Sequence, residues 1–131
     1  MTAYIATFPD AEVELFAVLA SQFTSYRWST KLPGTFTGIA IRIHRISGAN
    51  RDIAVDRPIV DIDVFSTTGE ADASTAARAI QASIIGLQGK RTPNGVIQMA
   101  RTVNGPRWMP DSNQTVIRYG ATYELYIRAA S

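Results

Sequence analysis

Two neighbouring segments alternate apolar and polar residues with the same period, and this pattern constrains the fold more than any other feature of the chain. The first segment has isoleucine at positions 39, 41 and 43, and the second has Val60, Ile62 and Val64 around two aspartates. A period of two is that of a half-buried strand. The polar connection between the segments is short. We therefore predict an antiparallel hairpin of strands 39–46 and 57–65, with both apolar sets on the core face.

The polar face of this predicted hairpin carries the strongest candidates for chemistry in the sequence. Asp61 and Asp63 are the only carboxylate pair on one face of a predicted strand, and His44 is the only histidine. On one strand face the two carboxylates lie about 7 Å apart, a separation that overlaps that of some inverting glycosidases. Opposite charges across a hairpin, here with Arg42, are however ordinary sheet pairing. We interpret these residues as structural and expect no catalytic, metal or cofactor site.

The first predicted helix, residues 10–23, is apolar on more than one side. Acidic residues occupy its first turns, where the helix dipole favours negative charge. From Leu15 to Ala20 every residue is apolar, so the helix needs to be covered on several sides. Two interpretations stay open: burial in the centre of the domain, or contact of one side with another subunit. Leu15 and Leu19 are our candidate contact residues on this helix.

The remaining elements complete an α+β pattern. Residues 70–88 have apolar residues at helical spacing, and Gly89 follows as a stop signal. Strands are predicted over 96–103 and 116–128. The order α-β-β-α-β-β over a single domain, residues 1–131, indicates an antiparallel-rich four-stranded sheet with two helices packed on one face.

A long predicted loop, residues 104–115, is the most informative connection. It carries Trp108 and Met109 between two prolines, and long loops in compact domains tend to be functional. Tryptophan, methionine and arginine are enriched in interface cores, so Arg107, Trp108 and Met109 are our interface candidates. The alternative is that Trp108 folds back into the core of its own domain.

Composition excludes several classes of function. The 131 residues include no cysteine, which excludes disulfides, zinc–thiolate sites and thiol nucleophiles. Charged residues make up 18%, below the roughly 25% of an average domain, and this favours assembly. The net charge is +2 without a basic run, so no nucleic-acid groove is predicted, and Trp28, Tyr119 and Tyr126 are better read as core or interface aromatics. We expect neither a signal peptide nor a membrane span.

A family resemblance rests on four segments and on the order of the elements over residues 10–128. The segments are Arg57-Pro58-Ile59-Val60-Asp61-Ile62-Asp63-Val64-Phe65, the alanine-rich helix after it, Asn104-Gly105-Pro106-Arg107-Trp108-Met109-Pro110, and Arg118-Tyr119-Gly120-Ala121-Thr122-Tyr123. In these the chain resembles the tail terminator proteins of long-tailed bacteriophages, also called tail completion or neck proteins.

The resemblance implies a structural virion protein of the tail or neck, assembled in the host cytoplasm, and no enzymatic activity. Such a protein forms a homohexameric ring that caps the tail tube, ends tube polymerisation and joins the head-side connector or stopper protein. Genomic DNA passes through its lumen without sequence-specific binding. Two alternatives stay open: another neck or head–tail connector protein, and a small-molecule-binding α+β module, which would need a pocket with convergent polar groups.

Overall fold

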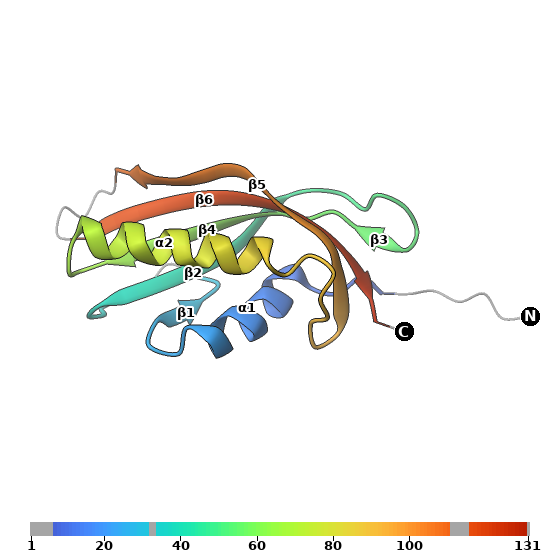
Figure 1. Ribbon diagram of the computed structural model, residues 1–131, viewed down its shortest axis with the longest axis horizontal. Helices are drawn as coiled ribbons and strands as arrows, with labels where there is room; N and C mark the ends of the chain where they lie inside the picture. Colours follow the sequence, from blue (N-terminus) through green and yellow to red (C-terminus); the bar gives the residue numbers. More distant parts are fainter. Residues whose placement is uncertain (1–6, 32–33, 111–115, 131) are drawn as a thin grey trace, which may run out of the picture.

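Two helices lie on one face of a curled sheet in the computed structural model, which describes residues 7–31, 34–110 and 116–130 (Figure 1). The elements are α1 (Ala11–Gln22), β1 (Arg27–Ser29), β2 (Ile39–Ser47), β3 (Val55–Asp56), β4 (Ile59–Ser66), α2 (Glu70–Ile85), β5 (Gly95–Met109) and β6 (Ile117–Ala129). Strands β1, β2, β4 and β6 follow one another across the sheet, and β6 also pairs with β5 and β3. The predicted α+β class and the placement of both helices on one face are confirmed.

The central hairpin is the one that the alternating pattern predicts. Strands β2 and β4 are antiparallel, with Ile41 opposite Val64 and Ile43 opposite Ile62, all four buried. In the same register Arg42 lies opposite Asp63, and His44 lies opposite Asp61. The apolar sets therefore share the helix side of the sheet, and the charged residues share the outer side.

Helix α1 begins where the sequence predicts. Asp10 caps it, because its Oδ1 accepts hydrogen bonds from the backbone N–H groups of Glu12, at 2.9 Å, and Val13, at 3.4 Å. Such a cap satisfies N–H groups that have no partner within the helix. One turn later the buried carboxylate of Glu14 accepts the Thr92 hydroxyl and the Asn94 backbone N–H, each at 2.6 Å. The helix is thereby fixed to the turn before β5.

Helix α2 packs an alanine-rich face on the sheet and is shorter than predicted. Ala73, Ala76 and Ala77 let its axis approach the strands, and Ile80 and Ile84 fill the core. The helix ends at Ile85 with Gly86 as its cap, three residues before the predicted end at residue 88. Gly89, expected as the stop, lies in the following turn with φ of +82°, a conformation that glycine adopts without strain.

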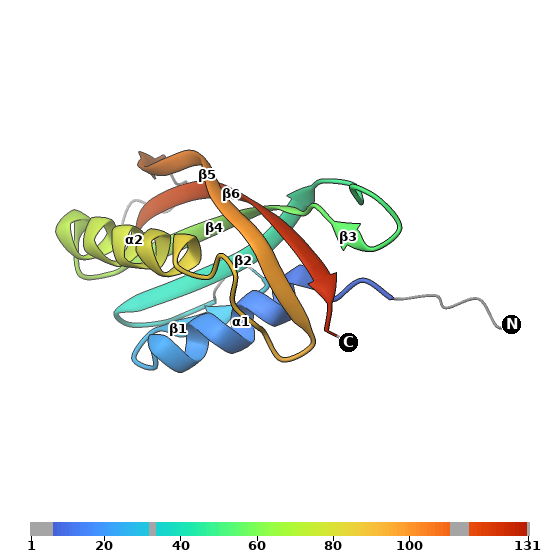
Figure 2. The same cartoon turned by 45° about the vertical axis from the view of Figure 1, so that its right-hand side comes forward.

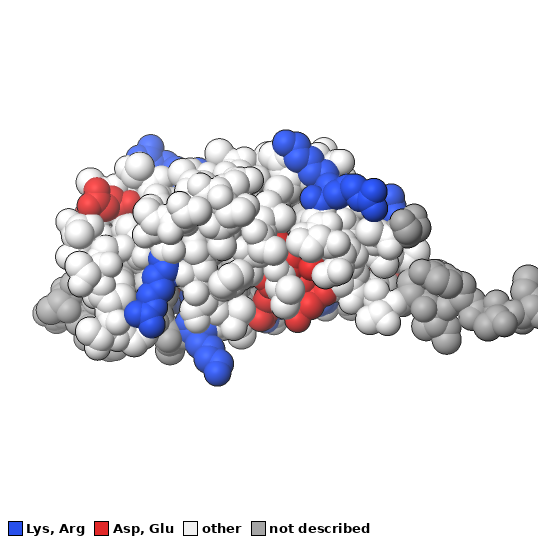
Figure 3. All heavy atoms as spheres, turned by 90° about the horizontal axis from the view of Figure 1, so that it is seen from below, with Lys and Arg blue, Asp and Glu red and all other residues white. Residues whose placement is uncertain are grey.

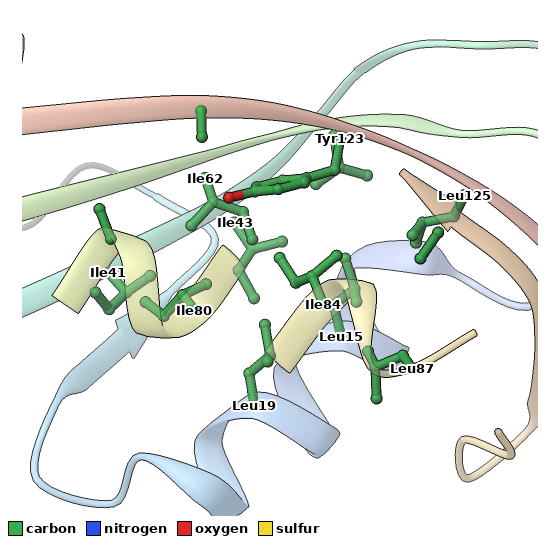
Figure 4. Close-up of a cluster of buried hydrophobic side chains, with 14 of the residues drawn as sticks. Leu15, Leu19, Ile41, Ile43, Ile62, Ile80, Ile84, Leu87, Tyr123 and Leu125 are labelled. Carbon is green, nitrogen blue, oxygen red and sulfur yellow. The ribbon is translucent and has the colours of Figure 1, made fainter. Parts of the chain in front are cut away.

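The core lies between the helices and the sheet. Figure 4 shows Leu15 and Leu19 of α1 beside Ile80 and Ile84 of α2, with the Tyr123 ring of β6 above them. All five side chains are at most 1% exposed. Alternate residues of β6, from Tyr119 to Ile127, share the face that packs on the helices.

The sheet is larger than the predicted four strands. The described residues form six strands, and the short β1 runs parallel to β2 while the two-residue β3 pairs with β6. Strands of two and three residues are too short to show an alternating pattern in the sequence. β1 and β3 are therefore recognised only from the strands with which they pair. The predicted order α-β-β-α-β-β is therefore corrected to α-β-β-β-β-α-β-β.

The predicted loop 104–115 is also corrected. Residues 104–109 continue β5 and pair with β6 as far as Met109 opposite Arg118, while residues 111–115 lie outside the described part. Strand β5 lies on the edge of the sheet beside β6 (Figure 2). An edge strand tolerates Pro106, which has no N–H to donate, and register shifts around Asn104 absorb the irregular backbone.

Candidate interaction surfaces

The polar residues that suggested chemistry form a structural network on the outer face of the sheet. Asp63 is only 2% exposed and lies between two arginines. Its Oδ2 accepts the Arg42 Nε–H at 2.9 Å, and its Oδ1 accepts the Arg118 Nη2–H at 3.0 Å. The Arg118 guanidinium also lies over the ring of Phe65, 5.9 Å from its centre. The buried carboxylate is thus neutralised from both sides and has no free oxygen to offer to a substrate.

Asp61 and His44 do not join Asp63 in a site. Asp61 accepts the Thr122 hydroxyl at 2.6 Å, and His44 is exposed at the neighbouring position of β2. Among the residues that the structure describes, no group of three or more His, Cys, Asp or Glu is placed to hold a metal ion. The arrangement matches the structural interpretation of these residues.

The end of β5, residues 104–109, carries the three predicted interface residues, and we call it the β5 arm. Trp108 is 55% exposed, although it lies on the helix side of the sheet opposite Tyr119. The Tyr119 hydroxyl donates to the first residue of α2, with 3.0 Å between Tyr119 Oη and Glu70 Oε1. Desolvation, and then the Glu70 carboxylate, raise the pKa of Tyr119 above its usual value. Trp108 therefore lies beside an ordered residue without entering the core, contrary to the alternative that it fills the core.

The other two predicted interface residues of the β5 arm, Arg107 and Met109, lie on the outer side of the sheet. Arg107 is exposed opposite Gly120, and half-buried Met109 lies over that glycine. A Cβ at position 120 would meet Met109 Sδ and would lie 3.2 Å from Asp63 Oδ1. The glycine thus makes room for the methionine, which fastens the arm to the sheet while Arg107 and Trp108 remain exposed.

A second exposed apolar surface lies on α1. Leu15 and Leu19, the predicted contact residues, are completely buried within the chain. Val13 is 53% exposed and Phe16 is 36% exposed, and Ala17 is exposed beside them. At about 100° per residue Val13 and Ala17 lie on the side of the helix opposite the leucines, and Phe16 lies between that side and the buried one. We call Val13, Phe16 and Ala17 the α1 face.

The correction concerns which side of α1 is available for contact, and it follows from the burial of Leu15 and Leu19 in the structure. Burial in the centre of the domain is confirmed for the side that carries Leu15 and Leu19, and contact of another side with a second subunit stays a prediction. The sequence contains the signal: apolar residues also fill the positions opposite Leu15 and Leu19, where a surface helix normally has polar residues.

Charge is distributed unequally between these two surfaces. Figure 3, which views the molecule from the side on which α1 lies, shows a broad area without charged side chains. Residues 10–22 include three acidic residues and no basic one, whereas residues 95–110 include Arg101 and Arg107 and no acidic residue. Glu14 is however buried, Asp10 caps the helix, and Glu12 accepts the Arg45 backbone N–H. Arg101 pairs with Glu124, so Arg107 is the one cation of the β5 arm.

A further exposed apolar residue lies on the connection between β2 and β3. Ile53 is 85% exposed. The loop around it is nonetheless ordered, because Asp52 Oδ1 accepts the N–H groups of Ala54 and Val55, each at 2.9 Å. These backbone hydrogen bonds hold the pKa of Asp52 below its usual value. The Arg51 guanidinium lies 5.3 Å from the centre of the Tyr126 ring and holds the loop against β6.

An open hollow of about 640 Å³ lies beside the start of α1. It is lined by Phe8, Pro9, Asp10, Ala11, Glu12, Arg45, Asn50 and Asp56. Its charged groups already engage one another: Arg45 Nη1 donates to Asp56 Oδ2 at 2.7 Å, and Glu12 accepts the Arg45 backbone N–H at 2.8 Å. These groups serve the fold and do not converge on a ligand, unlike those of a small-molecule site. No helix in the described part has the length and apolarity that crossing a bilayer requires.

Comparison with known proteins finds a similar fold in a chain of a solved virion structure. No protein-family model and no curated protein sequence matches the chain. Among solved structures, it is similar to a chain of a structure described as the virion of the native gene transfer agent (GTA) particle. The TM-score is 0.67 at 15% sequence identity, and the match covers 90% of this chain and 94% of that one. The two chains share a fold over nearly their whole lengths.

Proposed function

We propose that this protein is a structural virion protein that forms a homohexameric ring, caps the tail tube and ends its polymerisation. The ring joins the tail to the head-side connector or stopper protein, and genomic DNA passes through its lumen. The protein is not an enzyme. The observation that carries the proposal is the fold shared, end to end, with a chain of a gene transfer agent virion.

The exposed surfaces support an assembly role. A ring is built from head-to-tail contacts, so each subunit needs two different patches. The β5 arm and the α1 face are two such patches, one with an exposed tryptophan and one with an exposed phenylalanine. The ordered loop around Ile53 offers a further contact, for the tail tube protein or for the connector.

The experiment that tests the proposal is a measurement of particle mass and shape. We expect sedimentation of the purified chain to give a hexamer or stacked hexamers, and negative-stain images to show rings with an open centre. The purified protein should also shorten tubes when it is added to polymerising tail tube protein. A chain that stays monomeric or dimeric at high concentration and leaves tube length unchanged would contradict the proposal.

A second candidate, another neck or head–tail connector protein, is favoured by the same structural match, because the match identifies a virion chain and not its position. The tube-length experiment separates the two. A connector protein would form rings without affecting tube length.

A further inference from the structure

We infer that Asn104 is a modification site, which converts spontaneously to aspartate and isoaspartate by reaction with the backbone nitrogen of Gly105. The site lies in the β5 arm, on the outer side of the sheet opposite Thr122. The inference goes beyond the proposed function and does not depend on the ring. The only co-reactant is water.

The chemistry follows from the Asn-Gly pair. The backbone nitrogen of Gly105 attacks Cγ of the Asn104 side chain and closes a five-membered succinimide ring. The bond from Cγ to Nδ2 breaks, and Nδ2 leaves as ammonia with the proton that the Gly105 nitrogen gives up. Water then opens the ring at either carbonyl, which yields aspartate or isoaspartate. Glycine favours the attack because it has no Cβ to restrict its backbone or to shield its nitrogen.

The structure leaves this pair accessible. Asn104 and Gly105 are both exposed. The register shifts between Asn104 and Arg107, where β5 has two residues against one of β6. Such a bulge leaves a residue outside the ladder of backbone hydrogen bonds. Among the described residues, no heavy atom beyond the chain neighbours lies within 4 Å of the position that a Cβ on Gly105 would take. The arm therefore has room for the succinimide ring.

A second Asn-Gly pair provides an internal comparison, because the fold holds it in place. Asn94 Nδ2 donates to Glu14 Oε2 at 3.2 Å, and the Asn94 backbone N–H donates to Glu14 Oε1 at 2.6 Å. The Asn94 carbonyl accepts the backbone N–H of Ala130 at 3.1 Å. Gly95 is buried, and a Cβ there would lie 2.9 Å from the Arg128 carbonyl oxygen. The group that has to leave and the backbone that has to turn are thus both fixed.

The products change the β5 arm. Either product places a carboxylate on the outer side of the sheet, where Arg107 also lies. Isoaspartate in addition routes the main chain through the former side chain and lengthens it by one carbon atom. Because pairing with β6 depends on register, the arm beyond residue 104, including Trp108, should lose its place on the sheet.

Peptide mapping of aged protein tests the inference. Trypsin cleaves after Arg91, Arg101 and Arg107, so the two pairs fall in separate peptides, residues 92–101 and 102–107. After incubation of the folded chain at mildly alkaline pH, the second peptide should appear in its aspartate and isoaspartate forms. The first should be modified at least about tenfold more slowly, which corresponds to about 1.4 kcal/mol for opening its contacts. Equal rates in the folded chain, or an unmodified Asn104, would overturn the inference.

Unfolded protein and one variant serve as controls. In urea both pairs are released from the fold, and they should react at similar rates. A difference that persists in urea would mean that the flanking residues select Asn104, and would overturn the structural argument. Gly105→Ala should suppress modification of Asn104 while the fold is kept, because the added Cβ enters open space. Unchanged modification in this variant would overturn the attack by the residue 105 nitrogen.

Glu14→Ala provides the reverse test. It removes the acceptors that hold Asn94, so the peptide of residues 92–101 should be modified faster than in the wild type, while the rate at Asn104 stays unchanged. An Asn94 that remains as protected as in the wild type would overturn the distinction between a held pair and an accessible one.

Discussion

At the scale of single residues, Asp63 shows how burial changes the contribution of an ion pair to stability. The alternating pattern predicts an ion pair with Arg42, and an exposed pair of this kind is worth well under about 1 kcal/mol. The structure adds a second arginine and leaves the carboxylate 2% exposed. Removing its charge would leave two guanidinium groups without their partner in a partly desolvated place.

We therefore expect Asp63→Asn to lower the free energy of unfolding by about 2–3 kcal/mol. This is somewhat less than the 3–5 kcal/mol of a fully buried pair, because the arginine side chains are 20% and 24% exposed. Asp61→Asn on the same strand is the matched control and should cost less than about 1 kcal/mol. Urea unfolding of the two variants measures both values. Equal losses would contradict the role of burial.

Two tyrosines, the buried Tyr123 and the half-buried Tyr119, predict how stability responds to alkaline pH. Burial raises the pKa of Tyr123, and desolvation together with Glu70 raises that of Tyr119, from a usual value of 10.0. Below pH 10 both phenols are protonated in the folded and unfolded chains, so they have no effect. As the pH rises above 10 the unfolded chain ionises first, and the free energy of unfolding should fall.

Tyr123→Phe isolates this effect. The variant should lose less stability between pH 9 and pH 11 than the wild type, as measured by urea unfolding at each pH. Tyr26→Phe, at a half-buried residue outside the main sheet, is the control and should follow the wild type. A Tyr123→Phe variant with the wild-type pH profile would contradict the assignment.

At the scale of elements, the sequence patterns predicted those helices and strands that are long and have a regular apolar period. The hairpin of β2 and β4, both helices and the inward face of β6 follow from periods of 2 and 3.6, because one face of each is buried in the core. The β5 arm could not be predicted as a strand from an apolar period. Gly105 and Pro106 are turn signals in a sequence, and only the position of β5 at the edge of the sheet makes them compatible with a strand.

The candidate contact residues could be predicted less completely than the elements that carry them. Trp108 was predicted because a large apolar residue between two prolines reads as an anchor, and its exposure agrees with that interpretation. The sequence predicts that α1 is apolar on more than one side, but the sequence alone does not say which side faces the sheet. Burial of Leu15 and Leu19 decides it and transfers the candidate surface to Val13 and Phe16.

The hydrogen bonds that attach α1 to the turn before β5 give a separate prediction. Glu14 accepts hydrogen bonds from the Thr92 hydroxyl and from the Asn94 backbone and side-chain N–H groups. Glu14→Ala leaves these donors without a partner, at about 1–3 kcal/mol for each one that stays buried, so we expect a loss of about 3 kcal/mol. Glu14→Gln retains one acceptor oxygen and should lose less. Hydrogen exchange at the Asn94 amide should accelerate in Glu14→Ala, and unchanged protection there would contradict the role of this carboxylate.

At the scale of the whole molecule, the two tryptophans are placed for different tasks. Trp28 is half-buried, its indole N–H donates to the Phe23 carbonyl at 2.9 Å, and its ring packs with those of Phe23 and Tyr26. Trp108 is exposed at the end of β5, near the opposite edge of the sheet. One stabilises the fold where β1 joins the sheet, and the other is free to contact another molecule.

This difference gives paired predictions for the two alanine variants. Trp28→Ala should lower the free energy of unfolding by about 2–4 kcal/mol, near the lower range for large core residues because the ring is only partly buried. Trp108→Ala should cost less than about 1 kcal/mol of stability but weaken association by about 2 kcal/mol or more, as expected of an anchor. In a Trp28→Phe chain, Trp108 is the sole tryptophan, and its emission should shift to shorter wavelength as concentration rises and water leaves its ring. A Trp108 emission that stays red at concentrations where the particle mass is that of a ring would show that the ring forms without it.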